Sequence, residues 1–185
     1  MADPKEYTLF SGGANGAEAF FGEMAEQYGL NEVNFTFDGH SPARTRGLRP
    51  LTPEELARKD VSLHYVSNLL HRKFTNAKLM RSVLQTIMYQ VDSSHEVFVV
   101  GTLREDGTIK GGTGWGAEFA KICNKPLYAF GQVRDGWFSW NHDKGEWDEC
   151  AEPVIGHRHF CGTGTRFLEE NGRKAIEDLF KRTFG

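Results

Sequence analysis

The pattern of apolar and polar positions divides the chain into short strands and longer amphipathic helices. Short apolar or alternating runs, which are typical of strands, are found at residues 7–11, 32–38, 97–101, 125–130 and 154–160. Residues 16–28 and 61–91 repeat apolar side chains at intervals of three and four, which predicts helices with one buried face. As one helix the longer pattern would span ~45 Å, so we expect a break near residues 75–76.

Two further segments complete the predicted elements. Residues 136–140 and 146–147 flank a polar turn and predict a β-hairpin. Its aromatic side chains either fill the core or form a wall on which a base stacks; they are Trp137, Phe138, Trp140 and Trp147. Residues 40–53 predict a loop, and Thr52, Pro53 and Glu55 at its end predict a helix that begins with a capping box.

Strands that alternate with helices predict an α/β fold. We expect a three-layer, Rossmann-like sandwich with a mostly parallel sheet and a small aromatic β-hairpin at one edge. A length of 185 residues suits one domain with a full hydrophobic core, so residues 1–185 are expected to form a single α/β domain that binds a nucleotide.

Composition narrows the classes of partner. A formal net charge of -3 argues against general affinity for nucleic acid, which requires a basic surface. No apolar run approaches the ~20 residues of a membrane span, and the amino terminus lacks the apolar core of a signal peptide. The cysteines, Cys123, Cys150 and Cys161, are odd in number and show no paired spacing. Reduced thiols in the cytoplasm are therefore expected.

Three glycine-rich turns each follow a predicted strand and precede a predicted helix. Residues 11–18 read SGGANGAE, residues 110–118 read KGGTGWGAE, and residues 161–166 read CGTGTR. Glycine lets a backbone approach a ligand closely, and the start of a helix directs N–H groups at an anion. One such turn is equally typical of a tight surface turn, but in a parallel sheet all three would meet at the carboxyl edge. We therefore expect at least two turns to line one phosphate-binding pocket.

The candidate site residues come mainly from these turns. The expected ligand-binding residues are Ser11, Gly12, Gly13, Ala14, Asn15, Gly16, Glu18, Gly111, Gly112, Thr113, Gly114, Trp115, Gly162, Thr163, Gly164, Thr165 and Arg166. Arg44 and Arg46 in the predicted loop either belong to a solvated basic surface or close over a phosphate, and both are candidates. His157, His159 and Cys161 share one face of a strand, but no fourth ligand is evident, and no metal site is expected.

The turns resemble those of a known superfamily. Residues 111–118 resemble the G-G-x-G-T-x-x-E signature of the SLOG superfamily, which includes the cytokinin-activating phosphoribohydrolases and nucleotide-sensing relatives. Residues 11–18 resemble its turn S-G-G-x-x-G-x-D/E, and residues 161–166 resemble the turn G-x-G-S-R that opens many members. Because the last turn stands here near the end of the chain, the order resembles the circularly permuted branch, which includes proteins assigned as molybdenum-cofactor carriers. Lys110 and Trp115 replace a proline and a threonine that are usual in the signature.

The resemblance implies two alternative functions. In the first, Glu118 is the catalytic carboxylate of a phosphoribohydrolase-like enzyme that hydrolyses the N-glycosidic bond of a nucleoside monophosphate, where a carboxylate stabilises positive charge or deprotonates water. Residues 12–16 and 111–114 would then hold phosphate, and Glu18 would orient ribose hydroxyls. In the second, the protein is a non-catalytic nucleotide sensor or a carrier of a nucleotide or pterin (molybdenum) cofactor.

Both alternatives imply the same partners. The ligand is a nucleotide-like small molecule, no cofactor is required for chemistry, and a bound nucleotide or molybdenum cofactor is a candidate occupant. Neither nucleic acid nor a membrane is an expected partner, and a homo-oligomer is expected.

Overall fold

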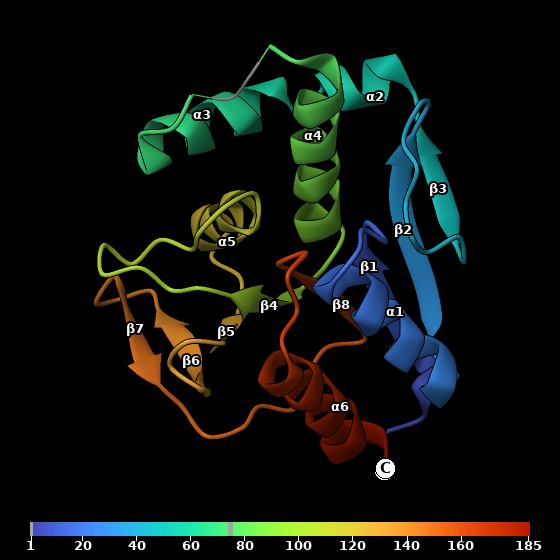
Figure 1. Ribbon diagram of the computed structural model, residues 1–185, viewed down its shortest axis with the longest axis vertical. Helices are drawn as coiled ribbons and strands as arrows, with labels where there is room; N and C mark the ends of the chain where they lie inside the picture. Colours follow the sequence, from blue (N-terminus) through green and yellow to red (C-terminus); the bar gives the residue numbers. More distant parts are fainter. Residues whose placement is uncertain (1, 74–75) are drawn as a thin grey trace.

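The computed structural model describes residues 2–73 and 76–185, and one sheet of eight strands runs through this part of the chain (Figure 1). The strands are β1 (Thr8–Ser11), β2 (Asn31–Phe37), β3 (Leu48–Leu51), β4 (Glu96–Gly101), β5 (Leu127–Gly131), β6 (Gly136–Asn141), β7 (Glu146–Glu149) and β8 (His159–Gly164). Their order is β3-β2-β1-β8-β4-β5-β6-β7. The neighbours from β3 to β5 pair in parallel, and β6 and β7 add an antiparallel hairpin.

Helices cover both faces of the sheet. They are α1 (Ala17–Tyr28), α2 (Pro53–Ala57), α3 (Asp60–Leu70), α4 (Lys78–Asp92), α5 (Thr113–Ile122) and α6 (Glu170–Phe184), after a short 3-10 turn, Pro4–Glu6. α1 and α6 pack together on one face, and α3, α4 and α5 pack on the other (Figure 1). The predicted three-layer, Rossmann-like sandwich with a mostly parallel sheet is therefore confirmed.

The core explains why the central strands read as apolar runs. Val97, Phe98, Val99 and Val100 of β4 are all fully buried, because helices cover both faces of a central parallel strand. On the α1 and α6 face, Phe21, Phe160 and Phe180 are also fully buried. Burying each of these phenylalanine side chains contributes ~1.5–3 kcal/mol to folding.

Two strands, β3 and β8, differ from the sequence prediction. β3 lies inside the predicted loop 40–53 and contains Pro50. As an edge strand, β3 pairs with β2 alone, so the N–H that proline lacks is not needed for a second partner. β8 begins at His159 and runs through Gly164, whereas the predicted strand was 154–160. A Cβ on Gly162 would lie 2.5 Å from the Phe21 ring, so this glycine allows close packing of α1 on β8.

Other predicted elements are confirmed. Thr52 and Glu55 form the capping box at the start of α2. The break in the long helical pattern is present, since α3 ends at Leu70 and α4 begins at Lys78; Thr75 itself lies outside the described residues. The hairpin forms as predicted. Its first strand buries Trp137 and Phe138 in the core, which is the first of the two alternatives for these aromatic side chains.

In the described part of the chain, no helix is both long enough and apolar enough to cross a lipid bilayer.

Candidate functional site

The glycine-rich segments meet where the order of strands changes direction. From β1 the chain continues outward to β2 and β3, whereas from β4 it continues to β5 on the other side, and β8 lies between β1 and β4. Open α/β sheets bind ligands at the carboxyl ends of the strands at such a switch point. A cavity of about 490 Å³ lies there, and segments from all three turns line it.

The structure brings most, but not all, of the predicted site residues to this cavity. Those that line it are Gly12, Ala14, Asn15, Glu18, Gly111, Gly112, Thr113, Thr163, Gly164, Thr165 and Arg166. Those that do not line it are Ser11, Gly13, Gly16, Arg44, Arg46, Gly114, Trp115, Glu118 and Gly162. The predicted convergence of at least two turns on one cavity thus agrees with the structure, and ligand binding there stays a prediction.

Glu18, the second residue of α1, joins the first turn to two other elements. Its Oε2 accepts a hydrogen bond from the Ala14 amide at 3.1 Å, and its Oε1 accepts one from Thr163 Oγ1 at 2.9 Å. The side-chain amide of Gln90 is assigned the orientation in which both of its polar atoms form hydrogen bonds. The Gln90 nitrogen then donates to Glu18 Oε1 at 3.2 Å, and the Gln90 oxygen accepts from the Gly12 amide at 3.2 Å. Burial raises the pKa of Glu18, and these hydrogen bonds oppose that shift. The carboxyl group therefore binds the chain itself, and its predicted role toward ribose hydroxyls stays a prediction.

The first and third turns are packed directly against each other. The Ala17 amide donates to the Thr165 carbonyl at 2.9 Å, and the Thr165 amide donates to the Val100 carbonyl at 2.8 Å. Gly16 has a φ of 94°, and a Cβ there would collide with the Thr165 carbonyl and lie 2.5 Å from the Arg166 Cα. Only glycine fits this position. The carboxyl ends of β1, β4 and β8 are therefore held in a fixed relation around the cavity.

The second turn presents the open start of α5. Arg72, which follows α3, donates to the Gly111 carbonyl at 3.1 Å and to the Ile109 carbonyl at 3.3 Å, and so holds the loop in place. The amides of Gly112 and Thr113 have no acceptor among the described residues. A Cβ built on Gly112 meets no atom within 4 Å, so this residue faces open space in the cavity. Free amides at the positive end of a helix dipole are suited to an anion.

Charged side chains add to this polarity. Lys110 and Arg166 line the cavity from the second and third turns, and Glu169, the N-cap residue of α6, also lines it. His40 lines it from the β2–β3 connection, with its Nδ1 2.9 Å from Thr36 Oγ1, and burial lowers the pKa of this imidazole. Two cations beside free amides favour an anionic ligand.

Lys110, His40 and Phe167 are among the lining residues that were not predicted as ligand candidates from the sequence. Each of them lies in a connection that follows the carboxyl end of a strand, and this position could have identified them as candidates from the sequence. The carboxyl-edge argument that selected the glycines applies equally to such neighbours. A search for glycine-rich turns alone therefore misses part of the cavity lining.

The structure does not place Glu118 at the cavity. Its carboxylate pairs with Lys121 Nζ at 3.1 Å, and Lys121 Nζ lies 3.7 Å from the centre of the Trp140 ring. The reason is where α5 begins. The sequence predicts a helix after the turn 110–118, but α5 starts inside this turn at Thr113, and five residues at about 100° each rotate Glu118 roughly 140° away from the cavity-lining Thr113.

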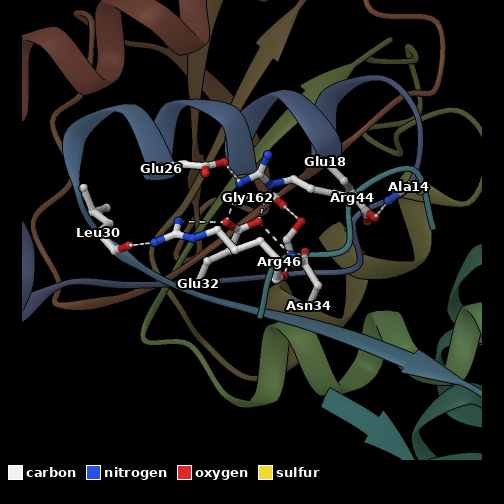
Figure 2. A network of polar contacts seen from close by, with 10 residues as sticks. Ala14, Glu18, Glu26, Leu30, Glu32, Asn34, Arg44, Arg46 and Gly162 are labelled. Atoms are coloured by element: carbon white, nitrogen blue, oxygen red, sulfur yellow. Dashed lines mark hydrogen bonds and ion pairs between the residues drawn. The ribbon is translucent and has the colours of Figure 1, made fainter. Parts of the chain in front are cut away.

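Arg44 and Arg46 do not line the cavity either. Both bind carboxylate groups instead (Figure 2). Arg44 donates to Glu26 at 2.7 Å and to Glu32 Oε2 at 2.8 Å, and Arg46 donates to Glu32 at 3.0 Å and to the Leu30 carbonyl at 3.0 Å. The Glu32 side chain is fully buried between them. The arginines thus fasten the β2–β3 connection beneath α1. Their predicted role in closing over a phosphate stays a prediction.

His157, His159 and Cys161, which share one face of the predicted strand, differ in burial in the structure. Cys161 is buried within β8, whereas His157 precedes that strand and His159 is its first residue. Both histidines are exposed at the amino end of β8, the end opposite the cavity.

Fold and cavity together define an α/β protein with a cavity at the carboxyl edge of the parallel part of its sheet. No protein-family model matches the chain, and no curated protein sequence matches it. Its structure is similar to that of the "Putative molybdenum carrier protein" from Syntrophus aciditrophicus SB, with a TM-score of 0.57, 15% sequence identity, and 97% of each chain covered. At this identity the similarity shows a shared fold.

Proposed function

We propose that this protein binds a small, anionic, nucleotide-like phosphoester in the cavity and does not hydrolyse it, acting as a carrier or a sensor. The observation that carries the proposal is the convergence of three glycine-rich segments on one cavity, with the free amides of Gly112 and Thr113 beside Lys110 and Arg166. An anion placed there would receive hydrogen bonds from backbone amides and charge from two side chains.

The position of Glu118 favours binding over hydrolysis. A catalytic carboxylate must reach the reacting atoms, and Glu118 is engaged with Lys121 on another side of α5. Glu18 does line the cavity, but its carboxyl oxygens accept hydrogen bonds from Ala14 and Thr163. The similarity in fold to a protein described as a molybdenum carrier supports the carrier alternative, with a nucleotide- or pterin-linked molybdenum cofactor as one candidate ligand.

Calorimetry with a panel of nucleoside monophosphates and a phosphorylated pterin, followed by chromatography of each mixture, tests the proposal. We expect at least one of these compounds to bind, no free base or ribose 5-phosphate to be released, and Glu118→Gln to bind as the wild type does. Release of base by the wild type that is lost in Glu118→Gln would instead establish the phosphoribohydrolase alternative. Absence of binding by every compound would contradict the proposed function itself.

A further inference from the structure

Phe167 occupies an unusual position for a large apolar side chain. It lies in the connection between β8 and α6, it lines the cavity, and it is 76% exposed. Single exposed apolar residues are common on protein surfaces, and Val133, which is 79% exposed and is not a lining residue of the cavity, is one of them. Phe167 differs because it lines the cavity, where a ligand would cover its exposed surface.

The backbone on both sides of Phe167 is fixed. Its amide donates to Thr165 Oγ1 at 3.0 Å, and its carbonyl accepts a hydrogen bond from Gln132 Nε2 at 3.2 Å. Thr165 is in turn bonded to Val100 of β4 and to Ala17 of α1. An aromatic residue held in this way binds a ligand without first ordering a loop, which lowers the entropic cost of association.

The cavity also has an apolar wall. α4 contributes Met80, Val83, Leu84 and Ile87 to the lining, and Met80 is 43% exposed. An inorganic oxyanion would use the amides and cations of the site and leave this wall and Phe167 in contact with water. A ligand that joins an anionic group to a flat ring would cover both kinds of surface, because aromatic side chains stack on flat rings and apolar walls exclude water from them.

We propose that Phe167 stacks on a planar heteroaromatic ring of the ligand, and that the ring is recognised in addition to the anionic group. This inference rests on the proposed function and specifies it. Purine, pyrimidine and pterin rings share the required flat π surface, so the ligand panel distinguishes the source of the ring. A bare oxyanion such as molybdate, and ribose 5-phosphate, lack the ring and should gain nothing from Phe167.

The test measures affinity by calorimetry for a ring-bearing and a ringless probe. For the nucleoside monophosphate or phosphorylated pterin that binds the wild type most tightly, Phe167→Ala should weaken binding about tenfold, and Phe167→Trp should retain it. Ribose 5-phosphate should bind both variants within about twofold of the wild type. Val133→Ala, a control at an equally exposed apolar residue, should change neither affinity.

The outcomes separate this inference from the proposed function. If ring-bearing and ringless phosphates bind the wild type equally well, or if Phe167→Ala keeps full affinity for the ring-bearing probe, the stacking role is overturned while phosphoester binding stands. Equal losses for both probes in Phe167→Ala also overturn it, because they would show a disturbed cavity. If no probe binds the wild type, both proposals fail.

Discussion

At the scale of single residues, the buried carboxyl group of Glu96 makes the free energy of unfolding depend on pH. Glu96 begins β4, is 3% exposed, and accepts hydrogen bonds from the Gly156 amide at 3.0 Å and the His157 amide at 3.2 Å. Burial raises the pKa of Glu96 from 4.5 to about 7, and the two amide bonds oppose the shift. Between these values the folded protein holds a proton that the unfolded chain has released. This contribution to stability is therefore full below pH 4.5 and is lost as the pH rises through about 7.

Replacing Glu96 by Gln should remove this dependence. The glutamine oxygen can accept both amide bonds and cannot ionise. The difference in free energy of unfolding between Glu96→Gln and the wild type should grow in favour of the variant by up to ~3 kcal/mol between pH 4.5 and 7.5. Urea unfolding at several pH values measures it, with the exposed Glu105→Gln as the control. A difference that stays constant over this range would contradict the assignment.

The direction in which the Glu118 side chain points could not be predicted before the boundaries of its helix were known. The sequence places a glutamate shortly after a glycine-rich turn, and the orientation of its side chain depends on where the helix begins. The sequence places the predicted helix after the glycine-rich turn 110–118, whereas α5 begins inside this turn at Thr113, and this start decides which side of the helix faces the cavity. Glycines disfavour helices, so the sequence signal pointed to a later start, and packing of α5 on the sheet overrode it.

At the scale of elements, the β2–β3 connection depends on buried ion pairs. Arg44 and Arg46 neutralise Glu32, whose side chain is fully buried (Figure 2). Arg44→Ala would leave this carboxylate with Arg46 alone, and removing one partner of a buried pair costs ~3–5 kcal/mol. We therefore expect Arg44→Ala to destabilise the protein by about 3 kcal/mol, toward the low end because Arg46 remains. Ligand affinity in the folded variant should not change.

Arg49 supplies the control within the same connection. It pairs with Glu55 at 2.6 Å, but its side chain is 48% exposed, so Arg49→Ala should cost only ~1 kcal/mol or less. Denaturant unfolding of both variants gives the comparison, and calorimetry gives their ligand affinity. Equal stability losses would argue against a special role of the buried pair. Weaker ligand binding by folded Arg44→Ala would favour the phosphate clamp, one of the two alternatives that the sequence left open.

Most helices and strands could be predicted from the sequence, because the spacing of apolar residues is a local property of each segment. The exceptions depend on partners that are distant in sequence. β3 forms because β2 offers an edge to a segment that contains Pro50, and β8 continues through Gly162 because β1 and β4 pair with it on both sides. The glycines that line the cavity could be predicted from the sequence. His40 and Phe167 were not predicted, because they reach the cavity only through the way the β2–β3 and β8–α6 connections fold.

At the scale of the whole molecule, the order of the strands creates the cavity. β8 is the last strand in the sequence, yet it lies at the centre of the sheet, so its carboxyl end joins those of β1 and β4. One consequence is that the end of the chain, through Thr163, Thr165 and Arg166, completes a site begun by residues 12–18. The predicted homo-oligomer stays a prediction at this scale.

The central claim is that the opening beside the second turn is where the ligand's anionic group lies. Gly112 tests it cleanly, because a Cβ there meets no protein atom within 4 Å and its φ of -60° suits other residues. Gly136→Val in β6 is the matched control, since the nearest atom to a Cβ there is the Arg134 carbonyl oxygen at 4.0 Å and the residue lies outside the cavity lining. Both variants should fold with stability close to that of the wild type.

The decisive measurement is calorimetric titration of the wild type, Gly112→Val and Gly136→Val with the nucleotide-like phosphoester that binds best. The valine side chain would occupy the space of the ligand and block the amides at the start of α5, so Gly112→Val should lower affinity by ~100-fold or more, which corresponds to ~2.7 kcal/mol. Gly136→Val should bind as the wild type does. Unchanged affinity in a folded Gly112→Val protein would contradict the assignment of this cavity as the binding site.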